Sequence, residues 1–114
     1  MQNKKKEILN TAYEYIDKLN NGIKIIVEKI QEGNEYEAIK LIPSVADGID
    51  WLTQTIKVTE EVQKEPISID NLNEQLESLV EAFENEDYIL LGDLFNYEIM
   101  PILCEYKEKI EICL

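Results

Sequence analysis

The first thirty residues carry the pattern that most constrains the fold. Apolar side chains recur there at alternating intervals of three and four residues: Leu9, Ala12, Ile16, Leu19, Ile23, Ile26 and Ile30. This spacing puts them all on one face of an α-helix. It continues through Asn20-Asn21-Gly22, which otherwise resembles a turn, so we predict one unbroken helix over about residues 3–32. Gly22 costs that helix about 1 kcal/mol relative to alanine and suggests a close helix contact.

A second stripe with the same spacing follows, made of Ala38, Ile42, Val45, Ile49, Leu52, Ile56 and Thr59. Gly33 is a typical stop for the first helix, and Asn34 and Glu37 have the spacing of a capping box for the second. We therefore predict a helix over about residues 34–64. Pro43 lies inside it, and because proline removes one hydrogen bond and crowds the preceding turn, we expect a kink there.

The clearest connection in the chain is Glu65-Pro66-Ile67-Ser68. Ser68 can cap a third helix, predicted over about residues 68–85, while Ile67 and Leu72 have the spacing of a hydrophobic staple. The apolar face of this helix is Leu72, Leu76, Leu79 and Phe83. Its opposite face is purely acidic and consists of Asp70, Glu74, Glu77, Glu81 and Glu84.

A fourth helix is predicted over about residues 87–112, after the short turn Asn85-Glu86-Asp87. Because every connection is short, neighbouring helices should lie antiparallel. We therefore predict an all-α protein with a single domain over residues 1–114. Its architecture is a four-helix antiparallel up-down bundle, kinked at Pro43 and Pro101. A chain of 114 residues can bury a core without disulfides or metals.

The charge of the chain is strongly negative. Eleven lysines, with no arginine or histidine, face 24 acidic residues, and the formal net charge is −13. We expect no nucleic-acid binding, because affinity for phosphate backbones comes from lysine and arginine. The segment Glu65–Tyr106 holds eleven acids and no cation. Such a surface either keeps the protein soluble or attracts a basic partner.

The lack of histidine also limits the chemistry of the chain. Dinuclear carboxylate sites in helical bundles need Glu-x-x-His pairs, and nucleophilic triads need a base. Cys104 and Cys113 lie about 13 Å apart along a helix, too far for a disulfide, and do not make a zinc ligand set. We expect no catalytic residue, metal or cofactor. An all-oxygen Mg or Ca site at Asp47 or Asp50, or on the acidic face of the third helix, stays a minor alternative.

The location that we expect is the cytoplasm. The two cysteines fit a reducing compartment. The N-terminus meets acidic residues before any long apolar run, so it does not resemble a secretory signal. No stretch approaches the roughly 20 apolar residues of a membrane span, and we expect no contact with a membrane.

The most apolar stretch, residues 87–104, contains a candidate polar cluster. Asp93 lies between two leucines and one turn before Tyr97, and a carboxylate in apolar surroundings needs partners or its pKa rises. With Glu98 and Trp51, these residues are either structural or functional. In the structural case Asp93 forms a hydrogen bond with a tyrosine hydroxyl or with a neighbouring helix end. In the functional case, a small-molecule-binding protein or enzyme has its site around Asp93, Tyr97 and Trp51.

The fourth helix has more apolar residues than one face can hold, so it is either central or shared with another chain. The candidate interface is Leu91, Phe95, Ile99, Ile102 and Tyr106. Our leading hypothesis is a non-enzymatic acidic interaction module that forms a homodimer through this helix. A groove between its kinked helices could also bind a basic or amphipathic-helix protein. An antitoxin-like or nucleic-acid-mimicking inhibitor is a third hypothesis.

Two segments carry a resemblance to a known group of proteins: LVEAFENEDYILLGDLFNYEIMPIL at 79–103 and GIDWLTQTIKVTEEV at 48–62. The first has an acidic turn, an Asp-Tyr pair and an apolar helix containing Asp93, Tyr97-Glu98 and Pro101. The chain resembles a family of small uncharacterised all-helical cytosolic proteins of clostridia and bacilli, with a domain of unknown function. The resemblance implies a helical bacterial protein and carries over no catalytic residue, cofactor or substrate.

Overall fold

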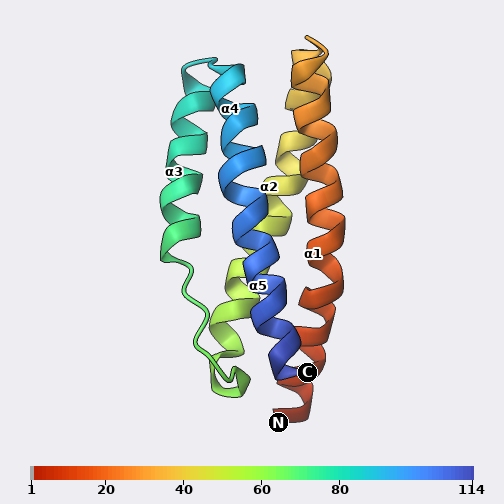
Figure 1. Ribbon diagram of the computed structural model, residues 1–114, viewed down its shortest axis with the longest axis vertical. Helices are drawn as coiled ribbons and strands as arrows, with labels where there is room; N and C mark the ends of the chain where they lie inside the picture. Colours follow the sequence, from red (N-terminus) through yellow and green to blue (C-terminus); the bar gives the residue numbers. More distant parts are fainter. Residues whose placement is uncertain (1) are drawn as a thin grey trace.

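The computed structural model describes residues 2–114 and contains four helical segments, each antiparallel to the next along the chain (Figure 1). The elements are, in order, α1 (Gln2–Gln31), α2 (Glu35–Val58), the 3₁₀ helix η1 (Glu60–Val62), α3 (Asp70–Glu84), α4 (Tyr88–Leu94), the π-helical turn η2 (Phe95–Ile99) and α5 (Met100–Cys113). The last three follow without a break and form helix four. The predicted all-α architecture of four helices is confirmed, and residues 2–114 contain no strand.

The core is built from the predicted apolar stripes of α1 and α2. Every member of the two stripes is buried except Ile30 and Ile42, which are half-buried. The first helix runs unbroken through Asn20-Asn21-Gly22, as predicted. A Cβ atom added to Gly22 would lie 3.2 Å from Cγ2 of Val45, so this glycine allows α1 and α2 to approach closely, also as predicted.

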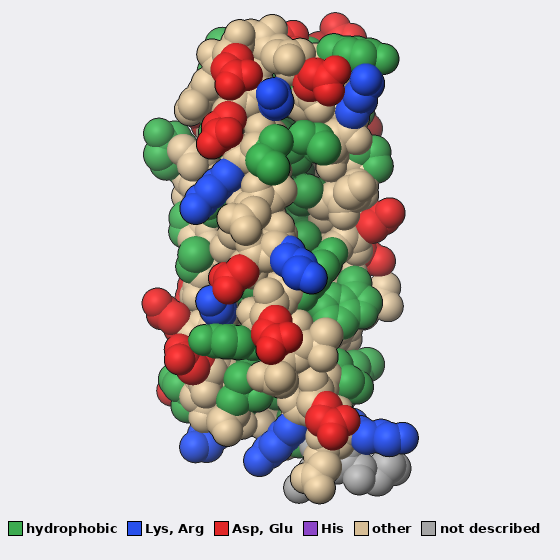
Figure 2. All heavy atoms as spheres, turned by 90° about the vertical axis from the view of Figure 1, so that its right-hand side faces the viewer, with side chains coloured by type: hydrophobic (Ala, Val, Ile, Leu, Met, Phe, Trp, Pro, Cys, Tyr) green, Lys and Arg blue, Asp and Glu red, His purple; other side chains and the backbone are tan. Residues whose placement is uncertain are grey.

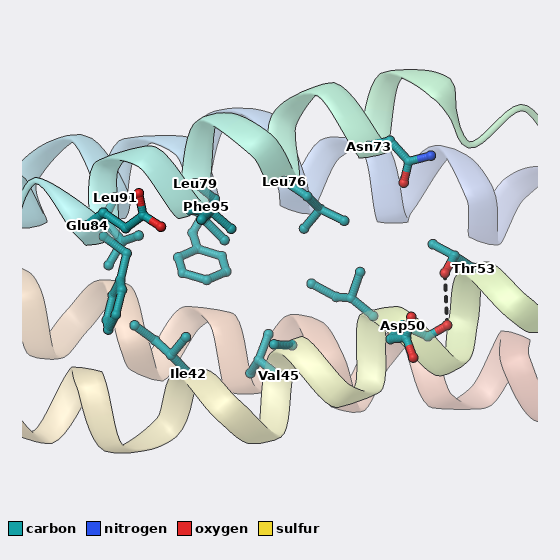
Figure 3. Close-up of a pocket in the computed structure, with 14 residues that line it drawn as sticks. Ile42, Val45, Asp50, Thr53, Asn73, Leu76, Leu79, Glu84, Leu91 and Phe95 are labelled. Carbon is teal, nitrogen blue, oxygen red and sulfur yellow. Dashed lines mark hydrogen bonds between the residues drawn. The ribbon is translucent and has the colours of Figure 1, made fainter.

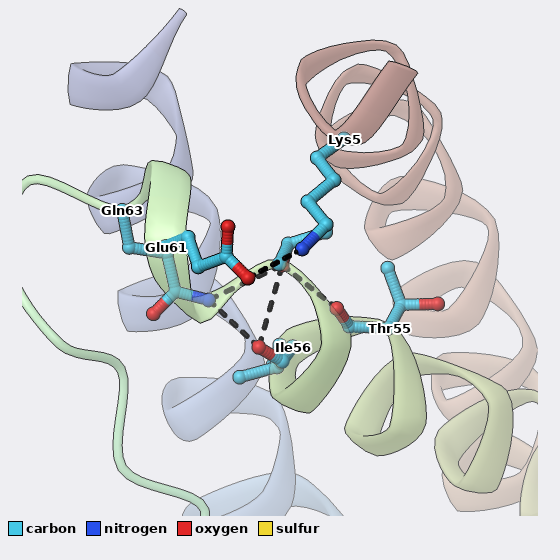
Figure 4. Close-up of polar contacts among 6 residues, drawn as sticks. Lys5, Thr55, Ile56, Glu61 and Gln63 are labelled. Atoms are coloured by element: carbon cyan, nitrogen blue, oxygen red, sulfur yellow. Dashed lines mark hydrogen bonds and ion pairs between the residues drawn. The ribbon is translucent and has the colours of Figure 1, made fainter. Parts of the chain in front are cut away.

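The second helix ends at Val58, earlier than the predicted residue 64. The hydroxyl of Thr59 donates to the carbonyl oxygen of Thr55 at 2.7 Å, and the Gln63 amide donates to the carbonyl oxygen of Ile56 at 2.8 Å (Figure 4). These side chains satisfy carbonyl groups at the helix end that would otherwise lack partners. The chain then turns through η1 and is not helical from residue 63 to 69.

Two predicted helix caps are wrong in detail. Asn34 precedes α2, but its side chain accepts no capping hydrogen bond, and Glu37 pairs with Lys40 at 3.5 Å. The third helix begins at Asp70, and Ser68 lies before its cap position. The Ser68 hydroxyl oxygen instead accepts a hydrogen bond from the backbone N–H of Asp70, at 3.3 Å. These polar side chains therefore bond locally, in the connections or on the helix surface.

Helix four contains a π-helical turn that the sequence analysis did not predict. The Met100 N–H bonds to the Phe95 carbonyl, five residues back, directly before Pro101. In an α-helix, side chains at four-residue spacing drift by about 40° per step around the axis. The fully buried Leu91, Phe95, Ile99 and Leu103 have this spacing. The wider turn compensates for part of the drift and keeps them facing the core. Kinks at Pro43, which lies inside α2, and at Pro101 stay predictions.

The packing around the bundle is uneven. α1 packs against α2 on one side and against α4, η2 and α5 on the other, whereas α3 packs against α4 and η2. Within residues 2–114 no hydrogen bond or ion pair joins α2 directly to α3. The connection from α2 to α3 runs along one end of the bundle, and α3 covers only part of its length (Figure 1). One side of α2 is therefore left without a packed neighbour.

No helix within residues 2–114 is long and apolar enough to cross a membrane.

Candidate functional site

An apolar groove of about 470 Å³ lies between α2 and α3. Its two walls are Ile42, Val45 and Ile49 of α2 and Leu76, Val80 and Phe83 of α3. Leu91 and Phe95 of helix four form its floor, and Figure 3 shows Phe95 in the space between the two walls. The groove is thus the open fourth side of the bundle.

The groove follows from the way in which α3 distributes its apolar residues. Leu72 and Leu79 are buried, whereas Val80 is 55% exposed and Phe83 is 41% exposed. An amphipathic helix with an apolar stripe wider than its one packed neighbour leaves part of that stripe uncovered. The uncovered part of α3 faces the uncovered part of α2. The two helices therefore offer apolar surface to a molecule between them.

The polar side chains that α2 contributes to the groove already have partners within α2. The Thr53 hydroxyl donates to the carbonyl oxygen of Asp50 at 2.8 Å, and the Asp50 carboxylate accepts from the Gln54 amide at 2.9 Å. Asn73 and Glu84 lie at opposite ends of the α3 wall (Figure 3). This arrangement is typical of a binding groove with an apolar centre and a polar rim.

The electrostatic character of the groove is negative. Asp50 lies on its α2 wall and Glu84 on its α3 wall, and Glu77 lines a shallow continuation of the groove along α3. The segment Glu65–Tyr106, which includes all of α3, has no lysine or arginine. In contrast, the face seen in Figure 2, on the α1 side, mixes lysines with acidic residues. The two sides of the molecule therefore differ in charge.

Within residues 2–114 no hydrogen bond joins the members of the predicted polar cluster. Asp93 and Glu98 are exposed and Tyr97 is 68% exposed, so the expectation that Asp93 lies in apolar surroundings is wrong. The reason is helical phase, because Asp93 lies about 200° around the helix from buried Leu91. Trp51 instead packs edge-on against Tyr15 of α1, with ring centroids 5.2 Å apart. The groove is lined by none of the four predicted residues.

The predicted interface residues of helix four belong to the core of their own chain. The side chains concerned are all buried, namely Leu91, Phe95, Ile99, Ile102 and Tyr106. Helix four contacts both α1 and α3, so two neighbours cover its apolar surplus. These five residues are thus not free for a second chain. Formation of a homodimer stays a prediction, and it would need other residues.

Tyr106 ties helix four to the connection that leads into α3. Its hydroxyl donates to the carbonyl oxygen of Ser68 at 2.8 Å. Burial raises the pKa of Tyr106 to about 12, and the charges of Glu105 and Asp70 act in the same direction. The phenol therefore stays protonated and can keep donating this hydrogen bond at neutral pH.

Two ion pairs brace the α1 side of the bundle. Lys107 contacts Asp17 at 2.8 Å and lies over the ring of Tyr13, and its hydrogen bond with Asp17 raises the pKa of the lysine. Lys5 contacts Glu61 at 2.7 Å (Figure 4), and this hydrogen bond lowers the pKa of Glu61. Both pairs connect α1 to another element. The α2–α3 side has no equivalent brace within residues 2–114.

Residues 2–114 contain no group of three or more cysteine and acidic side chains placed to hold a metal ion.

The sequence analysis predicted a groove but not the residues that form its walls. The signal in the sequence for its α3 wall was Val80, an apolar residue beside the stripe of Leu72, Leu76, Leu79 and Phe83.

Comparison with curated proteins and with solved structures finds no match. A family model described as a domain of unknown function (DUF8042) matches residues 7–109. The resemblance to an uncharacterised family is confirmed to that extent, whereas a bacterial source and a cytosolic location stay predictions. Since the match spans most of the sequence, the chain belongs to the DUF8042 family, a domain of unknown function.

Proposed function

We propose that this chain is a non-enzymatic interaction module that binds a helix of another protein in the groove between α2 and α3. The observation that supports this most directly is the open side of the bundle, where apolar walls from two helices face each other without packing. A guest helix placed there would act as an additional member of the bundle. Helix-in-groove binding of this kind uses apolar anchors at intervals of three and four residues.

The dimensions of the groove wall suit such a guest. α3 has 15 residues, which correspond to about 22 Å of helix, or roughly four turns. A guest helix of similar length would cover the exposed parts of Val80 and Phe83, with a gain of about 25 cal/mol per Å² of apolar surface removed from water.

The chemistry of the chain supports the non-enzymatic part of the proposal. The chain has no histidine, and in the groove the Asp50 carboxylate and the Thr53 hydroxyl make hydrogen bonds within α2. The other carboxylate of the groove, Glu84, lies at the opposite end from Asp50 (Figure 3). General acid–base catalysis needs a positioned donor or acceptor that can reach a substrate.

A selection from a library of helical peptides of about 15 residues, with varied apolar residues on one face, would test the proposal. We expect the selected peptides to shift the NMR signals of groove residues. Ala46→Trp should then abolish binding, because Ala46 lines the groove and is exposed. The matched control is Ser44→Trp, since Ser44 is exposed on the same helix and lies about 160° around it from Ala46.

Both variants should keep the helical circular dichroism of the parent protein. The proposal is wrong if no peptide is selected, or if the selected peptides bind Ala46→Trp as well as they bind Ser44→Trp.

A small apolar molecule is the second candidate for the groove. The volume of about 470 Å³ lies within the range of roughly 300–1,000 Å³ that is usual for ligand sites. Such a site would use the groove residues and not Asp93, Tyr97 and Trp51. Small aromatic compounds that raise the melting temperature of the parent but not of Ala46→Trp, together with an unsuccessful peptide selection, would favour this candidate.

Self-association is a separate part of the proposal. Helix four keeps exposed apolar or aromatic side chains at Ile89, which is 76% exposed, and at Leu90, Tyr97 and Ile112. These are the residues through which helix four could form a homodimer. Sedimentation equilibrium tests the idea, and a strict monomer at high concentration would contradict it.

A further inference from the structure

A row of three carboxylates follows the α3 rim of the groove. Asp70, Glu77 and Glu84 are seven residues apart, so they lie almost in line along the helix, about 10.5 Å from one to the next. Glu84 lines the groove itself, Glu77 lines its continuation along α3, and Asp70 lines a hollow at the start of α3. The row therefore runs beside the whole length of the α3 wall.

The three carboxylates are exposed, and within residues 2–114 no ion pair uses them. All lysines of the chain lie outside Glu65–Tyr106, and the one that lines a hollow together with a member of the row is Lys57 of α2, beside Asp70. On the opposite wall Asp50 adds a further negative charge. A positively charged group that enters the groove would meet attraction from both walls, whereas nucleic acids and anionic membranes would be repelled.

We propose that the groove selects a guest helix that carries lysine or arginine at every seventh residue, on the flank that faces α3. This inference rests on the proposed function, since it describes the partner of the same groove. The physical basis is that of a coiled coil, where apolar side chains fill the seam and charges beside it choose partner and orientation. Cations at seven-residue intervals on the guest would match the 10.5 Å spacing of Asp70, Glu77 and Glu84.

The row also gives the guest a direction. A helix that is turned end for end in the groove exchanges the flank that faces α3 for the flank that faces α2. In the groove itself each wall has one carboxylate, Asp50 on α2 and Glu84 on α3. Beyond it the α3 rim continues with Glu77 and Asp70, whereas the α2 side of the hollow at Asp70 has the cation Lys57. A guest with cations on one flank is therefore bound preferentially in the orientation that brings them to α3.

Three synthetic peptides of about 18 residues with the same leucine seam would test the inference. The first carries lysine at every seventh position on one flank, the second carries glutamine at those positions, and the third carries the same number of lysines on the side away from the seam. We expect the first peptide to bind roughly tenfold more tightly than the other two at low salt. This preference should shrink at high ionic strength.

A pair of double variants provides the matched control. Glu77→Lys with Glu84→Lys reverses two charges of the row, whereas Glu74→Lys with Glu81→Lys makes the same change of net charge further from the groove. Glu81 lines a hollow on the α4 side of α3. The first double variant should lose the preference for the flank-lysine peptide and prefer a peptide with glutamate at those positions. The second should change affinity by less than about threefold.

The outcomes separate the two proposals. If all three peptides bind equally and Ala46→Trp abolishes their binding, the groove binds helices but the charge row does not select them, and this inference is wrong. If none of the three binds, or if Ala46→Trp has no effect, the proposed function itself fails. If the two double variants change the affinity for the flank-lysine peptide equally, only the net negative charge of α3 attracts the guest and the position of the carboxylates does not matter. This result would also overturn the inference.

Discussion

α2 has a closed side, which packs against α1, and an open side, which lines the groove towards α3. The difference between these two sides explains why the bundle has a groove. Towards α1, the glycines Gly22 and Gly48 allow close contact, and a Cβ at Gly48 would lie 2.5 Å from Tyr15 Oη and from Leu19 Cδ2. Towards α3, the same helix leaves Ile42 and Val45 in a groove. The comparison teaches that an apolar stripe does not by itself ensure a packed neighbour.

The largest expected change in the free energy of unfolding comes from a substitution on the closed side of α2. Leu52→Ala should lower the free energy of unfolding by about 2–5 kcal/mol, because Leu52 is fully buried and its removal leaves a cavity. The matched change on the open side, Ile42→Ala, should cost clearly less, since Ile42 is half-buried in the groove. Urea denaturation measures both. Equal costs would mean that the groove is closed in solution.

A smaller effect is expected from enlarging a small residue on each side. Gly48→Val should destabilise the protein by about 1–3 kcal/mol, because the new side chain overlaps Tyr15 and Leu19. Ala46→Val adds apolar volume to the open groove and should leave stability nearly unchanged. Thermal melts followed by circular dichroism compare the two. A strong loss for Ala46→Val would contradict the open side.

A still smaller loss of stability is expected when the hydrogen bond between Tyr106 and Ser68, before the start of α3, is removed. Tyr106→Phe removes the hydrogen bond to Ser68 and should cost about 0.5–1.5 kcal/mol. The parent should also be sensitive to pH. Because the folded-state pKa of Tyr106 is raised to about 12 from an ordinary value of 10.0, its stabilising contribution is complete below pH 10 and is lost as the pH rises through 12.

Unfolding measured between pH 9 and pH 12 in the parent and in Tyr106→Phe would isolate this contribution. The stability difference between the two proteins should narrow as the pH rises. A constant difference over that range would show that Tyr106 does not hold its proton in the way described.

The smallest change in stability is expected when the ion pair between α1 and α5 is removed. Lys107→Gln removes the ion pair with Asp17, and we expect a slight loss of stability that disappears at high salt, because exposed pairs are screened. Binding in the groove should not change, since the pair lies outside it. A loss of peptide affinity in this variant would mean that the two sides of the bundle are coupled.

The helices could be predicted well from the sequence, because each apolar residue at a spacing of three or four indicates independently which face of the helix is buried. The ends of α2 and α3 were less predictable, because they depend on contacts such as the one between Thr59 and Thr55, which form only when the turn is made. The π-helical turn did have a signal, the four-residue spacing of Leu91, Phe95, Ile99 and Leu103.

The candidate site was predictable only in part. The acidity of the groove follows from the lack of cations in Glu65–Tyr106, but the walls depend on how far α3 lies from α2, which no local pattern encodes. The sequence analysis assigned the extra apolar residues of helix four to an interface with a second chain. In the structure, two of them, Phe95 and Tyr106, are buried within the chain itself. Asp93 was misplaced because its neighbours in sequence are apolar, whereas its own side chain is exposed to solvent.

The π-helical turn has the geometry of a single residue inserted into a helix, and this has a consequence for how sequences of this family should be aligned. Removing one residue between Phe95 and Ile99 would rotate α5 by about 100° against α4. Phe95 would keep its place under the groove, while Tyr106 would turn away from Ser68. Relatives with the same composition but one residue fewer in this segment would therefore carry a differently anchored α3, and a gap in the alignment there would report a change in the groove between α2 and α3.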